Sequence, residues 1–134
     1  TPQELVSHPA DTFVASFTGA NLLHGVAEPQ DAELTLVRLE TGHRIYSPDT
    51  APGDVGVVVY PWDISVARSH GEDSAQNVIR GEVGPVFEVG NRVRVRVGPV
   101  TAEVTSSSAA RLDLARGGVA YATFKATGTL LVPL

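Results

Sequence analysis

The sequence contains no cysteine and no methionine, and Lys125 is its only lysine. Without cysteine, neither a disulfide nor a thiolate metal site can form. No run of about 18 apolar residues is present, so the sequence predicts no membrane-spanning helix. No basic segment followed by an apolar stretch opens the chain, which argues against a secretory signal peptide. Because position 1 is not methionine, we expect a fragment or a processed product. The lack of a membrane span, a signal peptide and cysteine fits a cytoplasmic location.

The sequence also lacks the patterns that support several kinds of catalysis. It has neither the phosphate loop G-x-x-x-x-G-K-[ST] nor the nucleophile elbow G-x-S-x-G. The histidines at positions 8, 24, 43 and 70 do not have the usual zinc-binding spacings. The acidic residues are scattered, so no carboxylate pair indicates acid–base chemistry. We therefore expect no enzymatic activity from this chain and no cofactor.

Charge and aromatic content weigh against nucleic-acid binding. The net charge is −5 and only 6% of the residues are aromatic, whereas nucleic-acid-binding domains are usually basic. The charge is uneven: residues 1–69 hold nine acids and three bases, and residues 70–134 hold six acids and seven bases. An anion-binding role, if the chain has one, therefore belongs to the second half.

Composition and turn signals predict a mainly β fold. Hydrophobic residues make up 43% of the chain, and 13 glycines and nine prolines punctuate it, which favours short strands. A helical segment is expected within residues 3–17, ended by Gly19, and one short helix at Ser108–Leu114. The expected strands are Leu22–Ala27, Glu33–Leu39, His43–Ser47, Val55–Tyr60, Ile64–Ala67, Asn77–Val89, Arg92–Val97, Val100–Thr105, Val119–Lys125 and Leu130–Val132.

Two pairs of segments resemble each other within the chain. Asn21–Val26 and Asn77–Val83 both begin with asparagine, two aliphatic residues, a base and glycine, and Pro52–Val57 resembles Arg116–Tyr121. These pairs indicate two tandem β-barrel-like units, with chance similarity as the alternative. The expected divisions are a helical junction at 1–19, a first β unit at 20–69 and a second at 70–134.

Two polar segments of the second half are candidate anion sites. Ser74-Ala75-Gln76-Asn77 offers a hydroxyl, amides and backbone N–H groups; the alternative is a polar linker whose Asn77 fixes a turn. Phe124-Lys125-Ala126-Thr127 ends an alternating strand with the only lysine beside a hydroxyl. Such a lysine contributes about 1.5–3 kcal/mol per charge-assisted hydrogen bond when shielded from water. The alternative is an ordinary lysine in solvent.

Two further segments have a simpler interpretation. The strand Arg92–Val97 places three valines on one face and three arginines on the other. It is either an anion or RNA surface or, as we prefer, a half-buried strand whose basic face discourages edge pairing. The serines in Thr105–Ser108 are expected to cap the following helix. Ser108 is also a candidate anion contact, because helix N-termini attract anions.

These segments together resemble a known family. Residues 74–81, 100–114 and 121–126 are similar to a molybdate-binding Mop, or TOBE-type, module. The family pattern is S-A-R-N, a glycine-ended strand, S-A-x-x-L-x-L-x-x-G and F-K-A/S. Residues 1–23 resemble the junction after the nucleotide-binding domain of ABC importer ATPases, and residues 60–64, Y-P-W-D-I, stand where that family usually has R-P-E-D-I.

The resemblance implies two tandem OB-like TOBE units without catalytic residues. It implies a regulatory, oxyanion-sensing and dimerisation domain of an importer's ATP-binding subunit, with molybdate, tungstate or sulfate as ligand. Its partners would be its own ATPase domain, the transporter's membrane subunits and a second copy, at the cytoplasmic face of the cell membrane. The oxyanion contacts would fall on Ser74, Gln76, Asn77, Ser108, Lys125, Ala126 and Thr127.

One departure from the family pattern bears on the ligand. Gln76 stands where the family commonly has arginine, which would weaken dianion binding by about 1.5–3 kcal/mol if no other cation replaces it. A structural dimerisation domain with a vestigial ligand site is therefore an alternative. A third interpretation is an oligonucleotide-binding barrel that uses Arg92, Arg94 and Arg96, which the scarce aromatics and the negative net charge disfavour.

Overall fold

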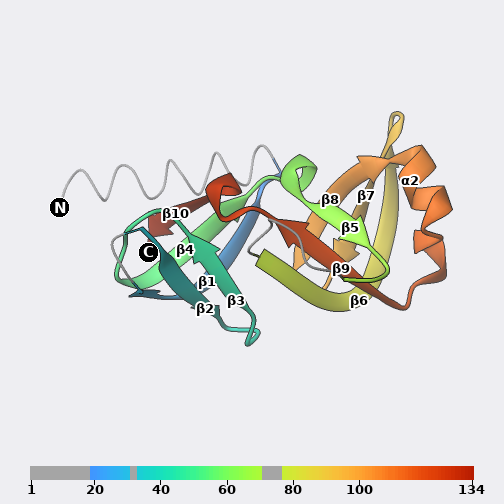
Figure 1. Cartoon of the computed structure of the whole chain (residues 1–134). Coiled ribbons are helices and arrows are strands. Elements are labelled where there is room, and N and C mark those ends of the chain that lie inside the picture. The colour runs from blue at the N-terminus through green and yellow to red at the C-terminus, as the bar shows by residue number, and fades with distance from the viewer. Residues whose placement is uncertain (1–18, 31–32, 71–76) are drawn as a thin grey trace. The chain divides into compact units, whose positions relative to one another are not determined.

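A computed structural model describes residues 19–30, 33–70 and 77–134 of the chain (Figure 1). The helical segment predicted at 3–17 lies outside the described residues. In the described part, no helix has the length and apolar character needed to cross a membrane. This part is mainly β, with ten strands, one short α-helix and three 3-10 turns.

The ten strands form two five-stranded antiparallel sheets. In spatial order, the first sheet contains β10 (Thr129–Pro133), β4 (Gly53–Val59), β1 (Asn21–Pro29), β2 (Thr35–Leu39) and β3 (Arg44–Ser47). The second contains β5 (Ser65–Ala67), β9 (Val119–Phe124), β6 (Asn77–Val89), β7 (Arg92–Val97) and β8 (Val100–Thr105). In each sheet the two outermost strands also contact each other, so each sheet curls into an OB-like unit. All ten predicted strands are confirmed, and β6, β7 and β8 have their predicted bounds.

The chain passes from one compact unit to the other after β4 and returns after β9. One unit contains the described residues up to Tyr60 together with Ala126–Leu134, and the other consists of Pro61–Lys125. β5 follows β4 in sequence but pairs with β9, and β10 follows β9 but pairs with β4. These units differ from the division expected between residues 69 and 70. The reason is physical: a short apolar strand pairs with whichever sheet edge the preceding turn brings it to, and its own sequence does not specify that edge.

The two sheets repeat one pattern of strands and register. Asn21 on β1 pairs with Val59 on β4, and Asn77 on β6 pairs with Phe124 on β9. The predicted correspondence of Asn21 with Asn77 is thereby confirmed. The register also aligns Val59 with Phe124, and hence Gly53 with Gly118, whereas the predicted alignment of Pro52 with Arg116 would set Gly53 against Gly117 and is wrong. Gly53 and Gly118 stand at the starts of β4 and β9 with similar positive φ, of 81° and 85°.

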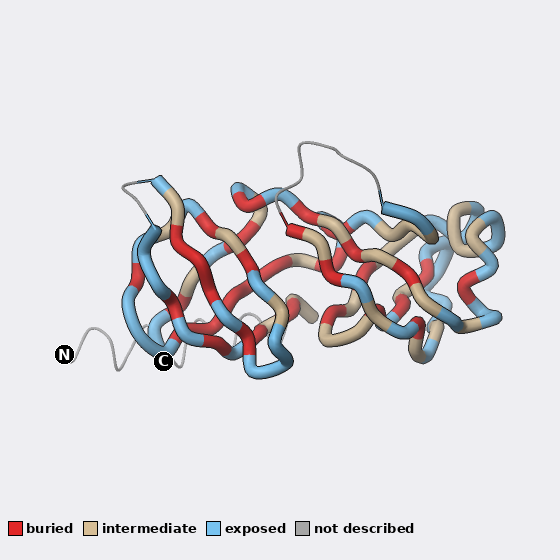
Figure 2. The backbone as a smooth tube through the Cα atoms, turned by 60° about the horizontal axis from the view of Figure 1, so that its bottom comes forward, coloured by how far each residue is buried: buried red, intermediate tan, exposed pale blue. Residues whose placement is uncertain are grey.

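Alternating side chains give each unit its own core (Figure 2). On β7 the three valines are buried while Arg92 and Arg96 are exposed, as the period-two pattern predicts. Leu114, just after the α-helix, closes the second core. The largest fully buried apolar side chains are Val37, Ile45, Val55, Val57 and Val59 in the first unit and Ile79, Val95, Val97, Val100 and Leu114 in the second.

The α-helix, α2, spans Ser106–Arg111 and begins at Ser106, earlier than the predicted start at Ser108. Its N-cap is Thr105 and not one of the serines: the Thr105 hydroxyl oxygen accepts the Ser108 N–H at 3.0 Å. The helix ends early because Asp113 adopts a left-handed conformation, with φ of 51°. The 3-10 turn η2 (Leu114–Arg116) follows it, and the turns η1 (Pro61–Asp63) and η3 (Ala126–Gly128) follow β4 and β9.

Gly25 and Gly81 occupy corresponding positions at which a strand passes very close to a neighbouring backbone. A Cβ at Gly25 would lie 2.6 Å from the Arg38 carbonyl oxygen, and one at Gly81 would lie 2.6 Å from the Gly98 nitrogen. Atoms at these distances overlap, and the backbone cannot rotate away as a side chain can. The glycine that ends each Asn-x-x-x-Gly segment is therefore required by packing.

We expect Gly81→Ala to lower the free energy of unfolding by about 1–3 kcal/mol, because the added methyl group forces β6 away from Gly98. Urea unfolding followed by circular dichroism measures this loss. Gly128→Ala is the control, because nothing lies within 4 Å of a Cβ at that position. Equal urea midpoints for the two variants would contradict the prediction.

Candidate functional site

Asn77 fixes the start of β6 against the end of β9. Its side chain is fully buried (0% exposed). It lies opposite Phe124, the last residue of β9, which is also buried. A buried side-chain amide keeps its place through hydrogen bonds. In the first unit the corresponding Asn21 donates from Nδ2 to the Val59 carbonyl oxygen at 3.2 Å. Asn77 is therefore part of the framework on which the following residues stand.

Lys125 comes directly after the residue that pairs with Asn77. Its side chain is exposed, as is that of Thr127, whereas Ala126 between them is buried. The turn η3 is held from within, because the Thr129 hydroxyl donates to the Ala126 carbonyl oxygen at 2.7 Å. The Lys125 ammonium thus follows a strand end that is fixed within one unit, and the Thr127 hydroxyl belongs to a turn that is held within the other. None of these residues is a carboxylate, so this donor set suits an anion.

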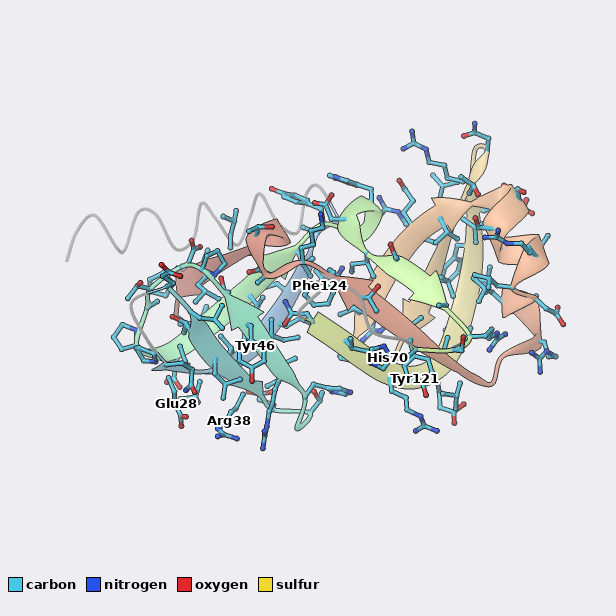
Figure 3. All side chains as sticks on the ribbon, in the orientation of Figure 1. Glu28, Arg38, Tyr46, His70, Tyr121 and Phe124 are labelled. Carbon is cyan, nitrogen blue, oxygen red and sulfur yellow. The ribbon has the colours of Figure 1, made fainter. Side chains whose placement is uncertain are left out.

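Ser74 and Gln76 lie outside the described residues, and their part in the site stays a prediction. The residues at both ends of the stretch 71–76 are held beside β9. His70 stacks on Tyr121 of β9, with ring centroids 5.7 Å apart and an interplanar angle of 25° (Figure 3). Asn77 pairs with Phe124 of the same strand.

Ser108 does not lie with the other candidate residues of the same chain. α2 leads through η2 into the start of β9, whereas Lys125 follows the end of β9. Figure 1 shows α2 at the end of the second unit away from the start of β6. The Ser108 hydroxyl accepts a hydrogen bond from Thr105 Oγ1 at 3.0 Å. Within one chain, Ser108 therefore serves the start of the helix.

The three arginine side chains of β7 all donate hydrogen bonds to groups of their own unit. Glu103 on β8, with a side chain only 7% exposed, accepts from Arg92 Nη1 at 3.1 Å and from Arg94 Nε at 3.2 Å. Arg96 Nε donates to the Gly98 carbonyl oxygen at 2.9 Å. Nucleic-acid backbones are bound by cations that are available to phosphates. This geometry counts against the oligonucleotide-binding alternative.

Arg68 closes the loop between α2 and β9, a role that no sequence pattern signals. Its guanidinium donates to three carbonyl oxygens: Nε to Leu112 at 3.0 Å, Nη1 to Val119 at 3.0 Å and Nη2 to Asp113 at 2.8 Å. These bonds hold the left-handed turn at Asp113 and join it to the end of β5. A lone arginine after a short strand has no local motif, so only the fold reveals its function.

Two open hollows lie elsewhere on the described residues. The larger, of about 530 Å³, is lined by Trp62, Arg92, Glu103, Val104 and Thr105. The smaller, of about 400 Å³, is lined by His24, Gly25, Val26, Glu40, Asp54 and Leu134. Neither contains a residue to which the family resemblance assigns an oxyanion contact. Over the described ranges, no group of three or more histidine and acidic side chains is arranged to hold a metal ion.

Known proteins resemble this chain in sequence. The TOBE domain family matches residues 73–131. The molybdate/tungstate import ATP-binding protein WtpC of Pyrococcus abyssi is 34% identical over 128 residues, which cover 92% of this chain and 36% of the relative. The protein of the same name from Pyrococcus horikoshii is 27% identical over 136 residues, which cover 98% of this chain and 38% of the relative. The chain therefore spans somewhat more than a third of the length of these relatives.

A solved structure resembles this chain in fold. The cytoplasmic molybdate-binding protein ModG, in a crystal form with molybdate bound, has a TM-score of 0.74 and 23% sequence identity. The similarity covers 84% of this chain and 96% of that chain. It confirms the predicted mainly β architecture of two OB-like units.

Asn77 and Lys125 should respond differently to truncation. Asn77→Ala removes a fully buried polar side chain and should lower the free energy of unfolding by about 1–3 kcal/mol. Lys125→Ala, at an exposed position, should change it by less than about 0.5 kcal/mol. Urea unfolding of both variants measures the difference. Similar losses in the two variants would show that Lys125 supports the fold.

Proposed function

We propose that the chain is a non-catalytic regulatory domain that binds an oxyanion, because the TOBE domain family matches residues 73–131. The ligand class is molybdate, tungstate or a related tetrahedral dianion. Two relatives are named as molybdate/tungstate import ATP-binding proteins, and the structure of similar fold contains molybdate. These names support an oxyanion ligand and an ABC importer's ATP-binding subunit as the parent protein.

The observation that carries this proposal is the position of Lys125. The only lysine of the chain follows a strand end that is fixed by the pairing of Asn77 with Phe124. A tetrahedral dianion accepts hydrogen bonds from several directions at once. An exposed ammonium, a nearby hydroxyl and backbone N–H groups on a fixed turn meet that need with little loss of conformational entropy.

The residues have different roles in the proposed site. Lys125 supplies the charge, Thr127 a hydroxyl and Ala126 a backbone N–H group. Asn77 acts by holding the strand end, because its side chain is fully buried. Ser74 and Gln76 complete the donor set on the evidence of the sequence resemblance. The same donors would accept sulfate, so the size of the anion decides the preference.

Ser108 enters the site only through a second copy of the chain. Within one chain, α2 and Lys125 lie at opposite ends of β9, so an anion at Lys125 would meet Ser108 only if a partner supplied it. Homodimerisation is therefore part of the proposal, with anions held at or near the interface. The other partners are the ATPase domain of the same subunit and the transporter's membrane subunits. These partners imply a location at the cytoplasmic face of the membrane.

In this proposal, anion binding regulates import because it is thermodynamically linked to the arrangement of the two ATPase domains. If the anion binds better to the arrangement in which two ATPase domains are apart, then a high internal anion concentration favours that arrangement and slows import. The domain need not catalyse anything for this purpose. It requires only different affinities for the anion in the two arrangements.

The first experiment is isothermal titration of the chain with molybdate and tungstate. The wild-type chain should bind saturably, and Lys125→Ala should weaken binding by about tenfold or more, because it loses charge-assisted hydrogen bonds of about 1.5–3 kcal/mol each. Arg116→Ala is the matched control, since it removes an exposed cation that is paired with Asp113. A folded wild-type chain that gives no heat at millimolar anion would overturn the proposal.

A structural dimerisation domain with a vestigial site is the second candidate. Gln76 is the observation that favours it, because the family pattern commonly has arginine at that position. Under this alternative, the chain would form dimers while neither molybdate nor the Lys125→Ala substitution changed any measured property of the transporter.

Gln76→Arg should tighten dianion binding by about tenfold or more, because it restores a charge-assisted hydrogen bond. Gln76→Leu is the control, since it removes the amide without adding charge. Titration of both variants with molybdate measures the change. If Gln76→Arg binds no better than wild type, residue 76 does not face the anion.

A further inference from the structure

The fold contains the proposed site positions twice. Asn21 begins β1 opposite Val59, the last residue of β4, just as Asn77 begins β6 opposite Phe124, the last residue of β9. Both asparagines are buried, with 9% and 0% exposed. A 3-10 turn follows each of the two partner strands after a single intervening residue: η1 follows β4 and η3 follows β9.

The correspondence therefore holds position by position. Because Val59 corresponds to Phe124, the segment 60–62 corresponds to the segment 125–127. We call residues 20–21 and 60–62 the first position, and residues 77 and 125–127 the second position.

The donors at the turn of the second position are missing from the first. The phenol of Tyr60 stands where Lys125 has an ammonium. Pro61 lacks the backbone N–H group that any other residue offers at the start of the turn. Trp62 has a bulky indole where the second position has the hydroxyl of Thr127. The first position thus keeps the framework asparagine and loses the ammonium and one backbone N–H group.

The charge around the first position disfavours an anion as well. The first position contains no lysine or arginine. Residues 1–69 contain nine acids and three bases. One of these bases, Arg38, is paired with Glu28 at 3.5 Å. Charge-assisted hydrogen bonds are about twice as strong as neutral ones, so an anion would find only the weaker kind at the first position.

Trp62 lies on the surface of the second unit. The turn η1 packs against β8, and the half-exposed Trp62 side chain lines the larger hollow together with Arg92 and Glu103. Its indole therefore covers part of the second unit.

We propose that only the second of the two equivalent positions binds an oxyanion and that residues 60–62 exclude it from the first. This inference rests on the proposed function and specifies it further. Each chain contributes one cationic turn, and all anion binding depends on Lys125.

The test is nuclear magnetic resonance of the isotopically labelled chain during titration with molybdate. The side-chain amides of Asn21 and Asn77 report on the two positions, and the indole N–H of Trp62 is the only one in the chain. We expect saturable shifts at Asn77 and at the backbone of residues 125–127, with none at Asn21 or Trp62. In Lys125→Ala, the affinity for molybdate measured from each shift should fall by about tenfold or more. The control Tyr60→Phe should bind molybdate as tightly as the wild type does.

The outcomes separate this inference from the proposed function. Saturable shifts at Asn21 or Trp62 that persist in Lys125→Ala would mean that the first position binds anion, and the inference would fail while the proposed function stands. If the wild-type chain shows no saturable shift with molybdate, tungstate or sulfate at millimolar concentration, the proposed function fails and the inference fails with it.

Discussion

The antiparallel pairing of β6 with β9 is the interaction on which the candidate site depends. Its register sets Asn77 opposite Phe124 and Ile79 opposite Ala122, and all four side chains are buried. A slip of one residue would turn the buried side chains of one strand to the outer face. The apolar core therefore fixes the point at which the chain leaves β9. The same register therefore buries the core side chains and places Lys125 at the end of β9.

The sequence predicts the strands well, because their alternation and their turns are local. β6, β7 and β8 have their predicted bounds since Gly90 and Gly98, both with positive φ, mark the turns between them. The sequence does not predict the pairing partners of the short strands β5 and β10. Both are short segments, and their residue types do not specify which sheet edge each strand joins.

The candidate site shows the same division between local and non-local information. Lys125 can be proposed from the sequence because a single lysine beside a hydroxyl at a strand end is a local feature. Arg68 is not found, because its three acceptors are backbone carbonyl oxygens that lie 44 to 51 residues away. Ser108 has the right residue type in the right motif, yet the fold gives it a cap partner at the far end of β9. A motif specifies residue types, whereas the register of the strands decides which of them meet.

The electrostatics of the chain explain how one turn can matter in a protein of net charge −5. The field of distant charges is screened over about 8 Å at physiological ionic strength, so an anion responds mainly to the groups around it. Most arginines in the described ranges already donate to protein oxygens: Arg92 and Arg94 to Glu103, Arg116 to Asp113, and Arg68 and Arg96 to carbonyls. Lysine has a compact, strongly hydrated charge on a flexible side chain, and at position 125 it stands exposed on a fixed turn. On our proposal, two copies of one fold thus differ in function because one turn carries an ammonium and a hydroxyl where the other carries a phenol and an indole.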